Sequence, residues 1–106
     1  MARYWMSDGT VIDTEKASQR WEEDTYWDGH NHISCATGSQ WEHQTLYRSR
    51  KGRYCIVRTS QWENQKDAAE WVSNEFAVRW LLTNGCAADD SAFPEELRCL
   101  VDELTE

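Results

Sequence analysis

The chain has 106 residues, the length of a single domain (residues 1–106) that can bury a core without disulfide support. Its formal net charge of −8 disfavours the binding of a polyanion, by a repulsion that cellular salt screens over a Debye length of roughly 8 Å. The chain has no run of about 18 apolar residues, which excludes a membrane-spanning helix, and its first residues lack the apolar region of a signal peptide. We therefore expect a cytoplasmic protein.

The charge is distributed unevenly along the chain. Residues 43–58 contain five basic and no acidic residues, whereas residues 89–106 contain seven acidic residues and one arginine. This polarity predicts either internal charge pairing or two surfaces with opposite binding preferences. The four cysteines form no C-x-x-C pair, so in a cytoplasmic protein we expect free thiols at Cys35, Cys55, Cys86 and Cys99.

The N-terminal third predicts short, mostly polar elements. Residues 3–6 are an aromatic run typical of a strand, residues 7–10 have the composition of a turn, and residues 11–12 add a small apolar patch. A cap at Asp13 or Thr14 predicts a surface helix through about Glu23, with Ala17 and Trp21 on one face.

The next segment predicts a loop and a strand. Asp28-Gly29 is a strong turn signal, so residues 24–31 are interpreted as a loop that carries Tyr26 and Trp27 into packing. Residues 32–37 predict a strand that leads to Gly38 and the Ser-Gln-Trp-Glu segment that follows it.

A near-repeat brackets the basic segment, because Ser-Gln-Trp-Glu occurs at residues 39–42 and again at residues 60–63. Between the two copies, residues 46–58 predict a β-hairpin with its turn at Lys51-Gly52. That turn places residue i opposite residue 103 minus i, and so Trp41 opposite Trp62. Alternation then predicts one face with Tyr47, Ser49, Tyr54 and Ile56, and another with Leu46, Arg48, Cys55 and Val57.

Two helices are predicted after the hairpin. A strand at residues 69–72 precedes an N-cap at Ser73 and a buried helix over residues 74–84, which ends at Gly85. One continuous helix over residues 67–84 is the alternative, and the good cap at Ser73 favours the strand. Pro94 opens an amphipathic helix whose apolar stripe is Leu97, Leu100, Val101 and Leu104.

These elements predict an α+β fold, in which a small antiparallel sheet centred on the hairpin packs against a buried helix and an amphipathic C-terminal helix. We place Trp71 and Trp80 in its core, with Trp41 and Trp62 partly exposed beside the hairpin.

Several segments resemble those of a group of small uncharacterised bacterial proteins. They are Asp28 to Ser34, Thr37 to His43, Leu46 to Arg48, Lys51 to Tyr54, Ser60 to Trp62, Ala69 to Ser73, and Ala77 to Gly85. The resemblance covers residues 28–100 or so and implies a shared fold, with no assigned activity. Phe76 and Val78 stand where that group has acidic or small residues, which argues against a solvent-exposed helix face and so against a monomer, and leaves a homodimer open.

A histidine–cysteine motif is one candidate site. His30, His32 and Cys35 have side chains that zinc accepts, with His43 or Cys55 as further ligands. Their spacing is not a standard zinc signature, and a polar loop with ordinary hydrogen bonds is the interpretation that we favour. We therefore predict no metal and no cofactor.

The basic hairpin is a second candidate site. Basic and aromatic residues alternate along it, as in β-ribbons that contact phosphates and stack on bases. The alternative is a solvated or internally paired hairpin, which the net negative charge favours. The residues of this nucleic-acid-binding hypothesis are Tyr47, Arg48, Arg50, Lys51, Arg53 and Tyr54.

The acidic C-terminal segment is the leading candidate site, with a solvated helix face as its alternative. The chain has no phosphate-binding loop, nucleophile elbow or H-E-x-x-H motif, so we predict a non-enzymatic interaction module. An acidic face suits a protein partner with a basic surface, as in an inhibitor or modulator of a nucleic-acid-handling protein, of the anti-CRISPR type. The predicted partner-binding residues are Asp89, Asp90, Glu95, Glu96, Asp102, Glu103, Trp41 and Trp62.

Overall fold

The computed structural model describes residues 3–38, 42–60, 67–87 and 90–105. Within these ranges the chain has the predicted α+β fold. No helix in them is long and apolar enough to cross a membrane. In chain order the elements are β1 (Arg3–Trp5), β2 (Val11–Asp13), the 3-10 helix η1 (Thr14–Lys16), β3 (Gln19–Glu22), β4 (Thr25–Trp27), β5 (His32–Ser34), β6 (Glu42–Arg48), β7 (Tyr54–Ser60), β8 (Ala68–Val72), α1 (Asn74–Thr83) and α2 (Glu95–Leu104).

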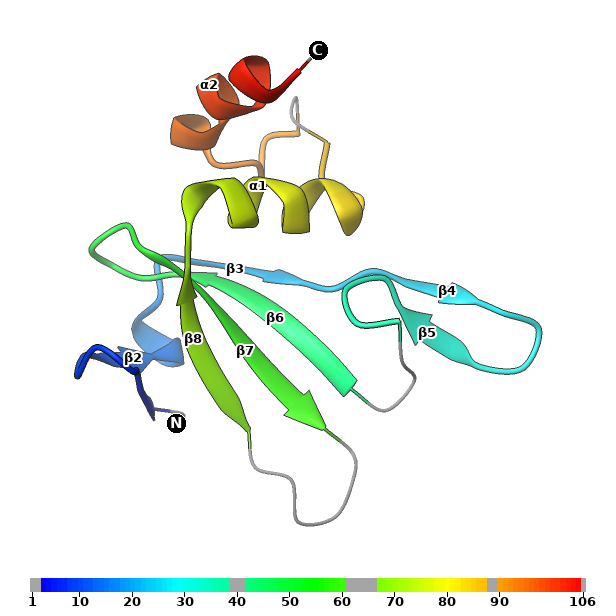
Figure 1. Ribbon diagram of the computed structural model, residues 1–106, viewed down its shortest axis with the longest axis horizontal. Helices are drawn as coiled ribbons and strands as arrows, with labels where there is room; N and C mark the ends of the chain where they lie inside the picture. The colour runs from blue at the N-terminus through cyan, green and yellow to red at the C-terminus, as the bar shows by residue number, and fades with distance from the viewer. Residues whose placement is uncertain (1–2, 39–41, 61–66, 88–89, 106) are drawn as a thin grey trace.

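A four-stranded antiparallel sheet forms the centre of the molecule, with the strand order β3-β6-β7-β8. Helices α1 and α2 pack on one face of this sheet, and the β1–β2 hairpin packs on the other (Figure 1). Strands β4 and β5 form a two-stranded arm that extends beyond the end of β3 and away from β1–β2 (Figure 1). The sheet therefore separates the helices from the N-terminal hairpin.

The larger core lies between the sheet and the two helices. Its strand residues occupy alternate positions that point toward the helices, while the residues between them, such as Cys55, face the smaller core on the other side of the sheet. Burial of each large apolar side chain contributes about 1.5–3 kcal/mol, so this cluster is the main source of stability. Its members are Trp21, Leu46, Tyr54, Ile56, Ala77, Val78, Trp80, Leu81, Phe93 and Leu97.

A smaller core joins the β1–β2 hairpin to the opposite face of the sheet. Met6 and Ile12 are buried against Cys55, and Tyr4, Tyr47, Ala69 and Trp71 pack around them. Burial raises the pKa of the Cys55 thiol to about 11, so this cysteine acts as a small apolar side chain. All four cysteines are free thiols, as predicted.

The β6–β7 hairpin forms with a different turn and register from those predicted. Arg48 pairs with Tyr54, and the amide of Gly52 donates to the Ser49 carbonyl at 2.9 Å, which leaves a three-residue loop. Gly52 takes a φ of 89°, the left-handed conformation that such a loop requires at its third position. The sum of paired residue numbers is therefore 102 and not 103.

This one-residue shift also corrects the predicted faces. Leu46 lies opposite Ile56 and shares the helix-covered face with it, while Tyr47 lies opposite Cys55 on the other face. A slip of one residue exchanges the two sides of a strand, because side chains alternate. Trp41 and Trp62, whose pairing was predicted from the wrong register, lie outside the described residues.

The predicted surface helix before Glu23 is wrong. Only η1 is helical there, and residues 19–22 form β3, which pairs with β6. Trp21 lies opposite Leu46 and is buried, while its neighbours Arg20 and Glu22 are exposed. Burial of Trp21 in the sheet outweighs the weak helical spacing of Ala17 and Trp21.

The predicted loop over residues 24–31 is only partly correct. Its turn forms at Asp28, whose carboxylate accepts hydrogen bonds from the amides of His30 at 2.8 Å and Asn31 at 2.7 Å. The preceding residues, however, form β4, and neither Tyr26 nor Trp27 is carried into packing, because both are exposed. The strand predicted over residues 32–37 is shorter, ending at Ser34.

The two helices confirm the prediction closely. The Ser73 hydroxyl accepts a hydrogen bond from the Phe76 amide at 3.1 Å, so α1 begins after β8 and the continuous helix over residues 67–84 is wrong. Val78 and Trp80 are buried in the larger core, but Phe76 and Leu82 are exposed. The helix therefore buries one face, and Trp71, also predicted to be buried, is half-buried in the smaller core.

Candidate functional site

A pocket of about 390 Å³ lies between the β1–β2 hairpin and the turn that joins β6 to β7. Ile12 and Trp71, which also line it, belong to the smaller core, so the pocket is on the sheet face opposite the helices. We call it the basic pocket, because five of its lining side chains are cationic: Arg3, Lys16, Arg50, Lys51 and Arg53.

The β6–β7 turn presents three of these cations. The Ser49 side chain accepts a hydrogen bond from the Arg53 amide at 3.1 Å, and the Ser49 amide donates to the Arg53 carbonyl at 2.7 Å. These bonds close the loop and leave Arg50 and Lys51 exposed at its tip. The cations are thus carried by a turn whose backbone is fixed by hydrogen bonds.

Two of the five cations are already paired with carboxylates. Arg3 Nε lies 3.2 Å from Asp13 Oδ2, and Arg53 Nη1 lies 3.1 Å from Asp8 Oδ2. Lys16 also interacts electrostatically with Asp13, which lines the pocket, whereas Arg50 and Lys51 form no ion pair within the described part of the chain. The pocket therefore has excess positive charge that an anionic ligand could neutralise.

A hydrogen-bonded group around Asp8 holds Arg53 and Trp71 in place. The Trp71 indole donates to Thr10 Oγ1 at 2.7 Å, and the Arg53 guanidinium lies 4.0 Å from the centre of the Trp71 ring. Hydrogen bonds from the Thr10 side chain and amide lower the pKa of Asp8 to about 2. Asp8 is therefore ionised at neutral pH and anchors this wall of the pocket.

Only some of the predicted nucleic-acid-binding residues lie at the pocket; the two tyrosines of that set pack in the cores. Arg50, Lys51 and Arg53 line the pocket, but Tyr54 is buried in the larger core and Tyr47 packs in the smaller one, so neither presents a ring for stacking. Sequence reasoning missed the contribution of Arg3, Lys16 and Trp71 to the pocket. The strand predicted over residues 3–6 could have indicated part of this site, because side-chain alternation along a strand places Arg3 and Trp5 on the same face.

One hydrogen-bonded network joins residues of the predicted nucleic-acid-binding set to a residue of the predicted partner-binding set. Arg48 Nε lies 2.8 Å from Glu96 Oε1, and the Tyr54 hydroxyl donates to the same oxygen at 2.6 Å. Burial raises the pKa of Glu96, but the bonds from Tyr54 and Arg48 outweigh it and leave this pKa lowered. Burial also raises the pKa of Tyr54. Arg48 and Glu96 thus join the hairpin to α2.

The rest of the predicted acidic set lies around α2. Glu95, Asp102 and Glu103 are exposed on that helix, whereas Asp90 accepts a hydrogen bond from the Ala92 amide at 2.9 Å in the loop before it. Asp89, Trp41 and Trp62 lie outside the described residues. We call Glu95, Asp102 and Glu103 the acidic face of α2.

The histidine–cysteine motif does not form a metal-binding group. Within the described ranges, no three His, Cys, Asp or Glu side chains converge in a way that could hold a metal ion. His32 makes an edge contact with the Trp27 ring at 5.1 Å, and Cys55 is buried in the smaller core. Cys35 follows β5, where its amide donates to the Asp24 carbonyl at 2.9 Å.

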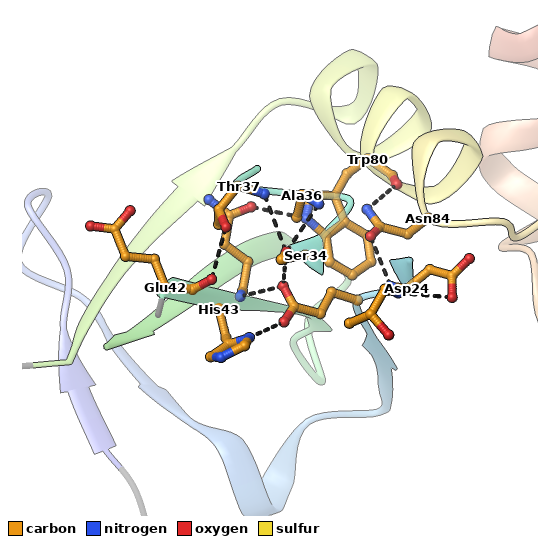
Figure 2. Close-up of polar contacts among 11 residues, drawn as sticks. Asp24, Ser34, Ala36, Thr37, Glu42, His43, Trp80 and Asn84 are labelled. Carbon is orange, nitrogen blue, oxygen red and sulfur yellow. Dashed lines mark hydrogen bonds and ion pairs between the residues drawn. The ribbon is translucent and has the colours of Figure 1, made fainter. Parts of the chain in front are cut away.

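A second polar cluster, which the sequence did not indicate, surrounds Glu23. Its carboxylate accepts hydrogen bonds from the Ser34 hydroxyl and from the Gln44 amide at 3.1 Å, and it pairs with His43 Nδ1. Figure 2 shows Ser34 and His43 approaching this carboxylate from different strands. The Glu23 side chain is only 10% exposed, so the cluster fastens the base of the β4–β5 arm to β6.

Comparison with known proteins found no matching family model, no similar curated protein and no similar solved structure.

Proposed function

We propose that this chain is a non-enzymatic binding module that takes a phosphate-bearing anion in the basic pocket. The observation that carries the proposal is the convergence of five cationic side chains from two hairpins and η1 around one concavity. Folding brings them together from positions 3 to 53 of the chain. Concentrated positive charge in a pocket favours anions, and guanidinium groups match phosphate oxygens in geometry.

The net charge of −8 does not oppose this binding locally. The acidic face of α2 belongs to the helix layer, whereas the pocket is on the other side of the sheet. The sheet lies between the two, and cellular salt screens interactions between exposed charges over a Debye length of roughly 8 Å. Glu96, at the start of α2, is already paired with Arg48.

Arg50→Glu is expected to weaken the binding of inorganic tripolyphosphate about tenfold at low salt, because it reverses an unpaired charge at the pocket. Arg79→Glu is the matched control, since it makes the same chemical change at an exposed position of α1. Isothermal titration of both variants measures the difference. Equal weakening by the two variants would mean that total charge, and not the pocket, governs binding.

A second proposal rests on the acidic face of α2, which supports docking on a basic protein surface, as in an inhibitor of a nucleic-acid-handling protein. Its three carboxylates are exposed; Glu96 is exposed as well, but its carboxylate is already engaged with Arg48 and Tyr54. Such complementarity increases association rates and specificity.

Reversing Glu95, Asp102 and Glu103 to lysine is expected to abolish salt-sensitive, nuclease-resistant capture of a basic protein by the immobilised chain. Arg50→Glu should leave that capture unchanged, because Arg50 lies on the other side of the sheet. Capture that survives the triple reversal would refute this second proposal.

A further inference from the structure

An exposed tryptophan lies on the β1–β2 face that contributes to the basic pocket. In the β1–β2 ladder Arg3 pairs with Asp13 and Trp5 pairs with Val11. Cross-strand partners share a face, and alternate residues along a strand share it too. Arg3, Val11 and Asp13 line the pocket together with Ile12, and Trp5, which does not line it, lies directly across the ladder from Val11.

Trp5 has no role in either core. The residues between these positions, Tyr4 and Ile12, pack in the smaller core, and Ile12 also lines the pocket. Trp5 itself is 79% exposed, and Val11 beside it is also exposed. A large planar ring therefore stands in solvent next to concentrated positive charge.

We propose that the basic pocket and Trp5 together bind single-stranded nucleic acid, with one base stacked on the Trp5 indole and the adjoining phosphates held by the pocket cations. This inference rests on the proposed function and names its ligand class. Single-strand binding sites combine a cationic groove for the backbone with aromatic rings for the bases. Arg50 and Lys51 at the turn and Arg3 beside Trp5 supply the first part, and Trp5 supplies the second.

A duplex does not fit this arrangement. Its bases are stacked on one another, so no base face is free for an indole. The residues from the hairpin turn also surround a pocket and do not form an elongated ribbon that could enter a groove. The surface therefore favours a flexible strand whose bases can turn outward.

The test compares a short oligothymidylate with inorganic tripolyphosphate, which carries phosphates but no base. Trp5→Ala is expected to weaken oligothymidylate binding about tenfold and to leave tripolyphosphate binding unchanged. Trp5→Phe, which retains an aromatic ring, should recover most of the lost affinity. Trp27→Ala is the matched control, because Trp27 is also exposed (60%) but lies on the β4–β5 arm; it should have no effect.

The outcomes separate this inference from the proposed function. If Trp5→Ala binds the oligothymidylate as tightly as the wild type while Arg50→Glu does not, the stacking role is overturned and the anion pocket stands. If Trp5→Ala weakens both ligands equally, stacking is also overturned. If duplex DNA binds as tightly as the single strand, the ligand class is wrong. If the wild type binds neither oligothymidylate nor tripolyphosphate, both proposals fail together.

Discussion

Replacing Leu97 by alanine is expected to lower the free energy of unfolding by about 3 kcal/mol. Leu97 is 0% exposed and is part of the core between the sheet and the helices. Alanine removes its packing contacts and leaves a cavity, and the buried neighbours Phe93 and Leu81 can close it only in part. Urea denaturation measures the change as a lower midpoint with an unchanged slope.

Leu104 provides the matched control for this prediction. It is a leucine of the same helix but is 53% exposed, so Leu104→Ala should cost less than about 1 kcal/mol. A similar loss for the two variants would show that α2 does not pack on the sheet through its Leu97 side. The assignment of its acidic face would then be wrong as well.

Replacing Glu23 by alanine is expected to lower the free energy of unfolding by about 3 kcal/mol. The substitution leaves the buried Ser34 hydroxyl, the Gln44 amide and the His43 ring without their shared acceptor. The Ser34 hydroxyl is fully buried, and a buried donor that loses a charged acceptor keeps its desolvation cost without a hydrogen bond; the half-buried Gln44 amide and His43 ring lose theirs as well. The loss should appear in thermal or urea unfolding followed by far-ultraviolet circular dichroism.

Glu22 is the control for this second prediction. It precedes Glu23 in the chain, is 71% exposed and pairs only with Arg20 at the surface in the described structure. Glu22→Ala should change stability by no more than about 0.5 kcal/mol. If Glu23→Ala were equally mild, the Glu23 cluster would not be what fastens the β4–β5 arm to β6.

The elements with strong local signals could be predicted from the sequence. The Ser73 cap, the glycine at position 85 and the apolar residues between them specify α1, and Pro94 followed by an apolar stripe specifies α2. Strand β3 could not be predicted in this way, because its only buried residue is Trp21 and its partner strand is more than twenty residues away. Its conformation is decided by a non-local pairing.

The hairpin shows why register is harder to predict than the hairpin itself. A two-residue turn at Lys51-Gly52 and a three-residue loop ending in Gly52 both require glycine at that position. The hydrogen bonds of Ser49 that select the longer loop are visible only in the structure. The shift of one residue places Tyr47 on the sheet face opposite to that of Tyr54 and Ile56.

The candidate site was predictable only in part for the same reason. The sequence left open whether the basic hairpin is paired internally, and three of its arginines are. Arg48 pairs with Glu96, Arg53 with Asp8, and Arg58 with Glu70. Arg50 and Lys51 have no such partner in the described residues, and the fold places Lys16 and the Asp13-paired Arg3 beside them from distant positions. No local pattern links these four residues.

The most direct test of the basic pocket is an NMR titration of the isotopically labelled chain with inorganic tripolyphosphate. The pocket proposal predicts that the shifted amides cluster at Thr10, Val11, Gly52 and Arg53, with α2 and the β4–β5 arm unchanged. Shifts that concentrate on α2 or the arm, or that spread evenly over the surface, would contradict it. An absence of shifts at millimolar tripolyphosphate and low salt would also contradict it.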